Sequence, residues 1–340
     1  MRVQVSLNFG SFLTLLMVGL MWLSPLSPAL AEADFRKAVE SIIMLQSEVP
    51  ATARTADTLG TQRQGSGVVI DDEGLVLTIG YLVMESDEIT LTNYWGKSIP
   101  ASFVAYDHST GFGLVRALSP IGVDAIEMGL SSSMEEKSPG LIVSLGNSRP
   151  ATPVQVVSRR TFAGAWEYLL EDAIYTMPPH REFGGAALIN EDGKLVGIGS
   201  LFVNDAMGLD APTPGNMFVP IDLIKPILPE LLAKGRRASS PDPWLGIYTT
   251  AQGGRVFVTR VADSGPAEKA GIKPGDIVMG VNGKRVTDMV EFYRRIRNLG
   301  EAGSNVKLDL LPRGSQALEI KQVVVKSLDR HDWLTKPISH

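Results

Sequence analysis

Short apolar runs separated by turn residues recur along most of the chain. Residues 68–70 and 75–78 are apolar and flank the turn Asp71–Gly74, a pattern that predicts a β-hairpin. The same arrangement returns at residues 187–198, around the turn Asn190–Gly193. Turn-punctuated short runs fill the region between them. The pattern therefore predicts two similar β-units, built as barrels or as a sandwich.

Beyond Met217 the pattern changes. Residues 221–233 are expected to be helical despite two prolines, and residues 234–242 are polar and rich in Gly, Ser and Pro, as is typical of a linker. A second domain of mixed α and β structure is expected at 243–327, followed by a loose tail at 328–340. Its expected strands are 245–249, 255–261, 277–281, 306–311 and 319–325, and its expected helices are 266–270 and 288–299.

The N-terminal segment has the layout of a secretory signal peptide. Arg2 precedes the apolar run Phe12–Leu23, and Ala29–Ala31 supplies a small-residue cleavage site. The alternative is a membrane anchor over residues 10–30, but two prolines interrupt its end. We expect cleavage after Ala31, a first domain at 32–233, and a mature protein that works outside the cytoplasm, in a bacterial periplasm.

The amino-acid composition limits the kinds of site and partner that this chain can have. The chain has 340 residues, 44% of them hydrophobic and 20% charged, enough for about two globular domains. It has no cysteine, which excludes disulfides, thiolate zinc sites and cysteine nucleophiles, and no clustered residues with metal-ligand spacing. We expect no cofactor and no metal. The net charge is −5 but uneven: residues 32–242 carry 16 basic and 27 acidic residues, and residues 243–327 carry 13 and 8. The basic residues are scattered, which argues against nucleic acid as a partner.

Two segments of the second domain resemble a known family. Ser264–Ile277 and Val281–Lys284 are similar to the PDZ domain of the HtrA (Deg) periplasmic proteases, and Trp244-Leu245-Gly246-Ile247 resembles the carboxylate-binding loop of that domain. The resemblance implies that backbone N–H groups of this loop hold a peptide C-terminus while the peptide adds as a strand beside it. Phe292 and Ile296 would then wall the pocket for the terminal side chain, or else belong to the domain core.

Residues 41–222 resemble the trypsin-like double β-barrel that precedes PDZ in this family. The matching segments are 65–78, 107–110, 144–147, 183–186 and 218–221. The fold class expected from the resemblance is mainly β: a trypsin-like double barrel followed by one PDZ domain of α+β type. Members of the family often assemble as trimers, so a homo-oligomer or association with a membrane complex is a further expectation.

The family's catalytic triad is absent at the matching positions. Tyr81 stands where the family has histidine, Gly111 where it has the acid, and Phe183 where it has the nucleophile. A phenol with a pKa near ~10 is a poor general base at neutral pH. The segment between Thr176 and Phe183 is also about two residues shorter than the family pattern, by the resemblance. We expect Tyr81 and Phe183 to fill the former cleft and the chain to be an inactive serine endopeptidase homologue.

Other residues offer weaker candidates. His108 and His180 are the two imidazoles of the first domain that could serve another constellation, and both are expected to be exposed loop residues. The basic second domain is expected either to dock on its own acidic barrel or to prefer acidic ligands. Arg294, Arg295 and Arg297 could supply that preference, or could form an ordinary solvated helix face.

Three functions follow from these expectations. The first is a secreted HtrA-like pseudoprotease that binds protein C-termini or extended peptides, as an adaptor, a regulator or a chaperone. The second is a structural subunit of an envelope or membrane complex with an unused groove. The third is a serine-type endopeptidase homologue that retains atypical activity.

Overall fold

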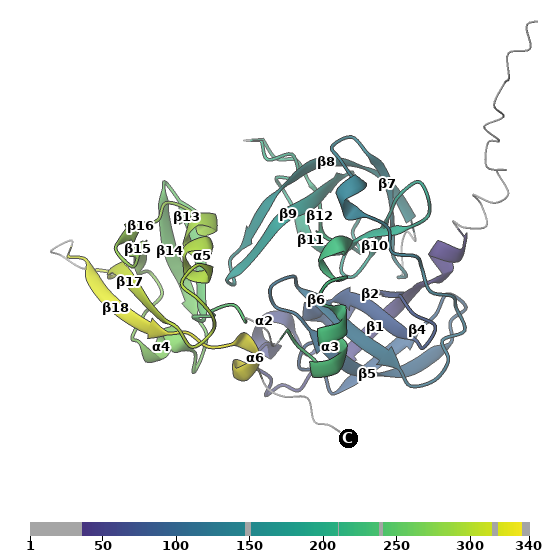
Figure 1. The fold of residues 1–340 in the computed structure, drawn as a ribbon, viewed down its shortest axis with the longest axis horizontal. Coiled ribbons are helices and arrows are strands. Elements are labelled where there is room, and N and C mark those ends of the chain that lie inside the picture. Colours follow the sequence, from purple (N-terminus) through teal and green to yellow (C-terminus); the bar gives the residue numbers. More distant parts are fainter. Residues whose placement is uncertain (1–35, 147–150, 210, 238–240, 315–318, 335–340) are drawn as a thin grey trace, which may run out of the picture.

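The computed structural model describes residues 36–146, 151–209, 211–237, 241–314 and 319–334 (Figure 1). Its first six strands close into a barrel in the order β1-β2-β3-β6-β5-β4. The hairpin expected at residues 68–78 is β2 and β3, which place Val68 opposite Leu77. The strands are β1 Ile42–Glu48, β2 Gln62–Val69, β3 Leu75–Ile79, β4 Glu88–Thr92, β5 Ser98–Tyr106 and β6 Phe112–Ala117, with α2 Ala56–Leu59 and the 3₁₀ turn η1 Gly80–Leu82 between them.

The next six strands form a second closed barrel in the order β10-β11-β12-β9-β8-β7. The second expected hairpin is β10 and β11. The paired ends of β8 and β9 reach toward the C-terminal domain, with Gly164 opposite Tyr168 (Figure 1). The strands are β7 Pro139–Val143, β8 Ala151–Gly164, β9 Tyr168–Met177, β10 Ala187–Ile189, β11 Leu195–Val203 and β12 Gly215–Pro220, with the 3₁₀ turn η2 Ser131–Ser133 before β7.

The segment after β12 is only partly helical. The 3₁₀ turn η3 Ile221–Leu223 precedes a short helix, α3 Leu228–Lys234, where residues 221–233 were expected to form one helix. Pro226 and Pro229 explain the difference, because each lacks the N–H that an uninterrupted helix would use. Pro229 is tolerated in the first turn of α3, because the N–H groups of a first turn have no partner within the helix.

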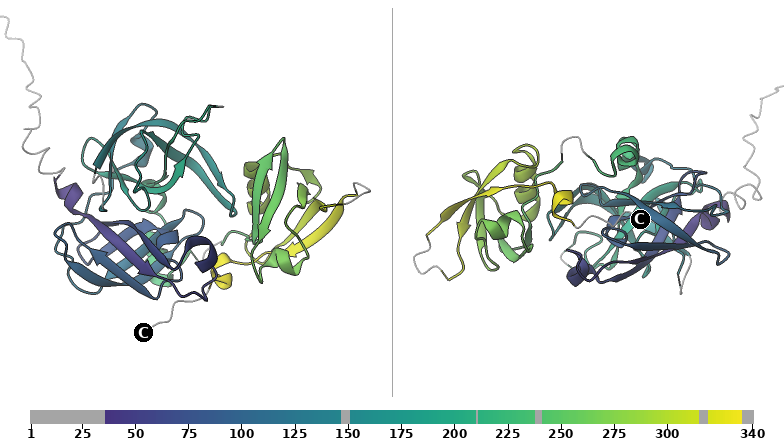
Figure 2. Two further views of the ribbon diagram at one scale, coloured as in Figure 1. Left: turned by 180° about the vertical axis from the view of Figure 1, so that it is seen from behind. Right: turned by 90° about the horizontal axis from the view of Figure 1, so that it is seen from below.

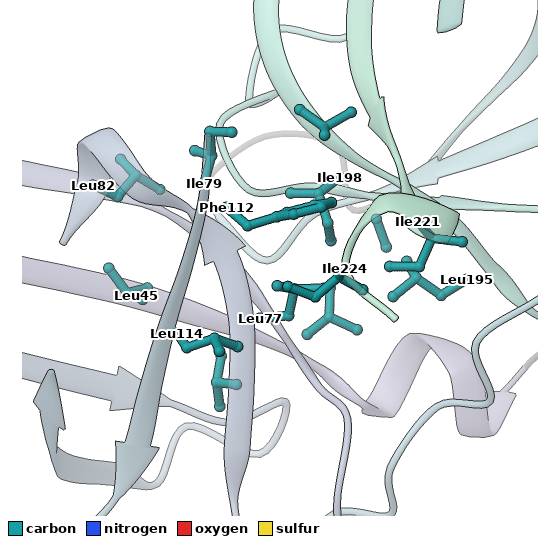
Figure 3. Packing of buried hydrophobic residues seen from close by; sticks show 14 of the residues in the cluster. Leu45, Leu77, Ile79, Leu82, Phe112, Leu114, Leu195, Ile198, Ile221 and Ile224 are labelled. Atoms are coloured by element: carbon teal, nitrogen blue, oxygen red, sulfur yellow. The ribbon is translucent and has the colours of Figure 1, made fainter. Parts of the chain in front are cut away.

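The two barrels share one apolar interface. Leu77 and Phe112 of the first barrel lie near Ile198 and Ile221 of the second, and all four side chains are fully or almost fully buried (Figure 3). The Ser66 N–H donates to the Gly184 carbonyl at 2.8 Å, which ties β2 to the segment before β10. The interface fixes the floor of the cleft between the barrels.

The C-terminal domain is an antiparallel sheet in the order β13-β14-β15-β17-β18, with β16 paired to β15. The helix expected at residues 288–299 is α5, and Asp288 caps it by accepting from the Glu291 N–H at 2.8 Å. The elements are β13 Ile247–Gln252, β14 Arg255–Val261, α4 Pro266–Lys269, β15 Ile277–Val281, β16 Lys284–Arg285, α5 Met289–Arg297, β17 Asn305–Leu311 and β18 Lys321–Lys326.

The segment after the last strand is ordered through Leu334, where a loose tail was expected from residue 328. Leu328 exchanges two backbone hydrogen bonds with Trp244, and the short helix α6 Arg330–Trp333 follows. The rings of Trp244 and Trp333 lie 4.9 Å apart, and both side chains are buried. Burial of two indoles is a sufficient driving force for this order.

The C-terminal domain lies against the end of the double barrel that carries the β8–β9 hairpin (Figures 1 and 2). Helix α5 contacts both β8 and β9. On the other side of the contact, α6 brings Arg330 to Tyr106 and His108 of the first barrel. The signal peptide expected at residues 1–31 lies outside the described residues.

Candidate functional site

The loop expected to bind a carboxylate already holds one. Glu167, at the tip of the β8–β9 hairpin, accepts from the Leu245 N–H at 2.8 Å and from the Ile247 N–H at 2.6 Å. The two bonds go to different carboxylate oxygens. Gly246 between them has φ +78, a conformation that glycine adopts without strain and that lets both N–H groups converge. The hairpin thus presents its carboxylate where the resemblance places a peptide terminus.

The hairpin backbone follows the carboxylate into the groove between β13 and α5. The Thr249 N–H donates to the Ala165 carbonyl at 2.9 Å, which is one rung of a strand-like pairing. The Tyr293 hydroxyl, on α5, donates to the Gly164 carbonyl at 2.9 Å and lies 2.7 Å from the Thr249 hydroxyl. Both edges of the groove therefore bind hairpin backbone, as β-augmentation requires.

Phe292 and Ile296 are completely or almost completely buried in the core of the C-terminal domain. Leu169 of the hairpin belongs to the same apolar cluster, although it comes from the second barrel. The position expected to receive a ligand's terminal side chain is therefore covered by a residue of this chain. Whether Phe292 and Ile296 also contact a peptide stays a prediction.

Burial has a clear electrostatic effect on Glu167. The loss of water raises the pKa of its carboxyl group to about 7, and the N–H groups of Ile247, Leu245 and Gly246 oppose that rise by stabilising the charged form. The residue also has φ +58, an uncommon backbone conformation for a side chain of this size. Glu167 is thus a buried acid in a strained turn, held in place by the facing domain.

Charge complementarity extends the contact. Arg294 on α5 pairs with Glu171 on β9 of the second barrel at 2.7 Å, whereas Arg297 pairs at 3.2 Å with Asp242 of the linker. Arg295 instead pairs with Glu291 on its own helix. The expectation that the basic domain docks on its own acidic barrel is confirmed. The exposed Arg294–Glu171 pair adds only a small part of the stabilisation, because water screens it.

The positions that match the family's triad lie around the cleft between the barrels. The Tyr81 hydroxyl donates to the Ser200 carbonyl at 2.9 Å, and burial raises the pKa of this phenol above its ordinary value. Gly111 has φ +82, and its carbonyl accepts from the Gly80 N–H at 2.7 Å. Phe183 lies on the segment before Gly184 and Gly185, which packs against β2.

The expectation of a filled cleft is wrong. A cavity of about 600 Å³ remains, and Tyr81 and Phe183 line it instead of closing it. The hydrogen bond to Ser200 holds the Tyr81 ring at the wall, and Trp166 and Tyr168 of the hairpin also line the cavity. The cavity is mainly apolar, so it differs from an open polar cleft as well.

Both histidines expected on the surface are buried. The His180 Nε2 lies 2.8 Å from the Ser144 Oγ, and its Nδ1 lies 2.8 Å from the Thr152 hydroxyl. His108 contacts the Tyr106 hydroxyl and accepts from Arg330. Burial lowers the pKa of both imidazoles; Glu182 partly opposes this at His180, whereas Arg330 adds to it at His108. The sequence could not show this burial, because His180 and His108 are covered by residues that are distant along the chain, such as Ser144 and Arg330.

Two functional candidates were missed by sequence reasoning. Glu167 pairs with residues about eighty positions away, and no local motif marks it. The available signals were the acidic charge of residues 32–242 and a single acid set between aromatic residues in Trp166-Glu167-Tyr168. Arg330 was missed because it lies in the segment expected to be loose. Among the described residues, no group of three His, Asp or Glu side chains forms a possible metal site.

Each of the two parts of the chain matches the sequence model of a known domain family. Residues 65–198 match the trypsin-like peptidase domain, and residues 243–321 match the PDZ domain. The chain is therefore a homologue of the HtrA (Deg) serine proteases, and the expected fold class is confirmed. Both matched ranges lie inside the expected domains 32–233 and 243–327.

The sequence is similar to those of several proteins named as serine proteases. The chain is 25% identical over 287 residues to the serine endoprotease DegS of Haemophilus influenzae, covering 81% of this chain and 80% of that one. It is 27% identical over 290 residues to the periplasmic serine endoprotease DegP of Escherichia coli, covering 78% and 58%. It is 28% identical over 267 residues to a probable periplasmic serine protease do/HhoA-like of Haemophilus influenzae, of which it spans only 56%.

Solved structures share the fold. The HtrA-type protease AlgW with decapeptide aligns with a TM-score of 0.53 at 17% identity, covering 90% of this chain and 99% of that one. The serine endoprotease from Yersinia pestis aligns with a TM-score of 0.52 at 20% identity, covering 88% and 97%. At this identity the likeness concerns the fold alone. No helix among the described residues is long and apolar enough to cross a membrane.

These findings overturn one expectation. The chain was expected to be an inactive endopeptidase homologue, with Tyr81, Gly111 and Phe183 at the triad positions. Its relatives are named as serine proteases or endoproteases, and the structure brings the hydroxyl of Ser144 and the imidazole of His180 into hydrogen-bond contact. The sequence offered His180 as a member of another constellation, but His180 was expected to be exposed and was not paired with Ser144.

Proposed function

We propose that this protein recognises the C-terminal carboxylate of proteins or extended peptides through its PDZ groove. It would act in the periplasm as an adaptor, a regulator or a chaperone. The names of its periplasmic relatives support that location. The groove would be used in competition with the protein's own β8–β9 hairpin.

One observation carries the proposal: two N–H groups of the loop of residues 244–247 hold the Glu167 carboxylate at 2.8 and 2.6 Å. Hydrogen bonds to a charged acceptor are about twice as strong as neutral ones. A peptide terminus presents the same two oxygens and can pair its backbone with β13, as Ala165 does. A loop that holds an internal carboxylate has the chemistry to hold an external one.

The experiment compares one peptide in two forms. A fluorescein-labelled decapeptide with an apolar C-terminal residue is titrated with the purified protein, as the free acid and as the C-terminal amide. We expect the free acid to bind at least about tenfold more tightly, since the amide removes one acceptor oxygen and the charge. Fluorescence anisotropy gives both affinities. Equal affinities would refute carboxylate recognition.

The Ser144–His180 contact favours a second candidate function, hydrolysis of peptide bonds. The His180 Nε2 lies 2.8 Å from the Ser144 Oγ. This is inside the range of about 2.6–3.2 Å in which a general base can take a proton. Its other nitrogen faces the Thr152 hydroxyl, and the Glu182 carboxylate lies 3.4 Å from the Ser144 Oγ. Both Ser144 and His180 are buried, so a substrate would reach them only after a local opening.

If this pair is catalytic, His180→Ala lowers the turnover of unfolded casein by at least about a hundredfold, because the general base is lost. Arg181→Ala, on the same segment but exposed, is the matched control and is expected to keep the wild-type rate. Peptide release measured by mass spectrometry follows the reaction. Equal turnover in the two variants would remove Ser144 and His180 from consideration.

A further inference from the structure

We infer that the cavity between the barrels and the C-terminal domain binds an organic anion with an apolar body, such as a fatty acid. This site is separate from the peptide groove. The inference stands on the shape and lining of the cavity and on a buried arginine at its edge, and it does not depend on the proposed recognition of peptide termini.

The cavity has the size and lining of a small-molecule site. Its volume of about 600 Å³ falls within the range of known ligand pockets. Side chains of both barrels, the hairpin and the C-terminal domain surround it. Its apolar lining includes Ile79, Tyr81, Met84, Trp166, Phe183 and Leu201.

The hydroxyl groups of Tyr81 and Tyr168 in these walls already have partners. The Tyr81 hydroxyl donates to the Ser200 carbonyl, and the Tyr168 hydroxyl donates to the Thr110 carbonyl at 2.6 Å. A ligand lying between these rings therefore meets their carbon faces. An extended hydrocarbon or an aromatic body satisfies such walls, whereas a strongly polar body would lose its hydration without replacement.

Arg330 gives the cavity a charged end. The residue is buried, with an exposed fraction of 6%, and it lines the cavity. One guanidinium nitrogen donates to His108 at 2.8 Å and lies 3.4 Å from the Tyr106 hydroxyl, and both of these partners are uncharged. The Nε has no partner. Among the described residues no carboxylate lies in ion-pair contact with Arg330, although the buried Glu167 carboxyl is near enough for Arg330 to act on it electrostatically.

A buried cation with no carboxylate in direct contact is unfavourable, and an anionic ligand bound beside it would relieve that cost. A planar carboxylate matches the fork of a guanidinium group. Arg260, which also lines the cavity, lies over the Tyr248 ring at 3.7 Å and adds positive charge on the side of the C-terminal domain. The arrangement therefore selects a ligand that is anionic at one end and apolar along its length.

Isothermal titration calorimetry tests the inference on the purified protein. Dodecanoate, below its micelle concentration, is compared with dodecanol, which has the same chain without the charge. We expect one dodecanoate per chain, bound at least tenfold more tightly than dodecanol, with a change in tryptophan fluorescence because Trp166 lines the site. Equal affinity for the two compounds would overturn the role of Arg330.

Variants separate the two parts of the site. Arg330→Gln is expected to weaken dodecanoate at least tenfold and to leave dodecanol unchanged, while Arg330→Lys restores part of the difference. Leu201→Trp, which fills the cavity without touching the charge, is expected to abolish binding of both. Arg255→Gln, an exposed arginine of the same domain, is the control. Unchanged dodecanoate binding in both Arg330→Gln and Leu201→Trp, or binding of apolar peptides in place of dodecanoate, would refute the inference.

Discussion

Replacing Glu167 with alanine is expected to raise the affinity of the PDZ groove for a C-terminal peptide at least tenfold. In the wild-type protein a peptide must first displace a tethered carboxylate that occupies two N–H donors at 2.8 and 2.6 Å. A tethered ligand competes at an effective concentration in the range of about 1 mM or above. Fluorescence anisotropy with the free-acid decapeptide measures the gain.

Glu171→Ala is the matched control for this variant. Glu171 lies on the same hairpin and pairs with Arg294 of the same domain, but the pair is exposed and does not involve the carboxylate loop. An exposed ion pair contributes roughly 0–1 kcal/mol, so its loss is expected to change peptide affinity by no more than about fivefold. If Glu171→Ala and Glu167→Ala behave alike, general charge attraction and not occupancy of the loop holds the hairpin.

The gain in peptide affinity that Glu167→Ala shows over the wild-type protein is expected to depend on pH. The pKa of the docked Glu167 carboxyl is about 7, against 4.5 for a free one, so the docked state binds a proton more tightly than the released state. Docking is therefore strongest at acidic pH and weakens as pH rises from 4.5 through 7. The ratio of the two affinities is expected to be at least about tenfold larger at pH 5 than at pH 8. A constant ratio would contradict this assignment, and taking the ratio cancels the titration of the peptide itself.

Gly246→Glu is expected to lower peptide affinity at least thirtyfold in the Glu167→Ala background. A Cβ at this position would lie 3.2 Å from both Ala262 and the Trp244 ring, and a residue with φ +78 is strained if it carries a side chain. The added carboxylate would also repel a peptide terminus beside the same N–H groups. Both effects act on the loop itself, and anisotropy measures the loss.

Gly253→Glu is the control that separates effects on the carboxylate-binding loop from the effects of any added charge and backbone strain in the same domain. Gly253 has φ +56, in the turn after β13, and no atom lies within 4 Å of the Cβ that would be added. The variant carries the same charge and a similar backbone strain in the same domain, so in the Glu167→Ala background we expect it to keep the affinity of Glu167→Ala itself. Circular dichroism melting checks that both variants are folded. A folded Gly246→Glu protein with unchanged affinity would show that the loop does not bind the terminus.

Local patterns predicted most of the fold. Turn residues around short apolar runs predicted the hairpins β2–β3 and β10–β11, and the helix expected at residues 288–299 is α5. These features are encoded within a few residues. The segment after residue 327 was misjudged because its order depends on Trp333 meeting Trp244, a contact between positions that are distant in the sequence.

The site was predictable only in part. The carboxylate loop at residues 244–247 could be assigned by its resemblance to a family motif, but its internal ligand could not, because Glu167 reaches it through the packing of two domains. The burial of His180 against Ser144 and Thr152 likewise arises from three separate strands and loops. Contacts of this kind leave no spacing pattern in a single sequence.

Hydrogen–deuterium exchange with mass spectrometry tests the central claim most directly, because it follows the hairpin and the groove in one sample. On addition of a saturating free-acid peptide, we expect faster exchange in residues 161–171 of the hairpin and slower exchange in residues 245–252 of the groove. That opposite change is the signature of one carboxylate replacing another. Protection of the groove with no change in the hairpin would show that peptide and hairpin do not compete, and would contradict the account.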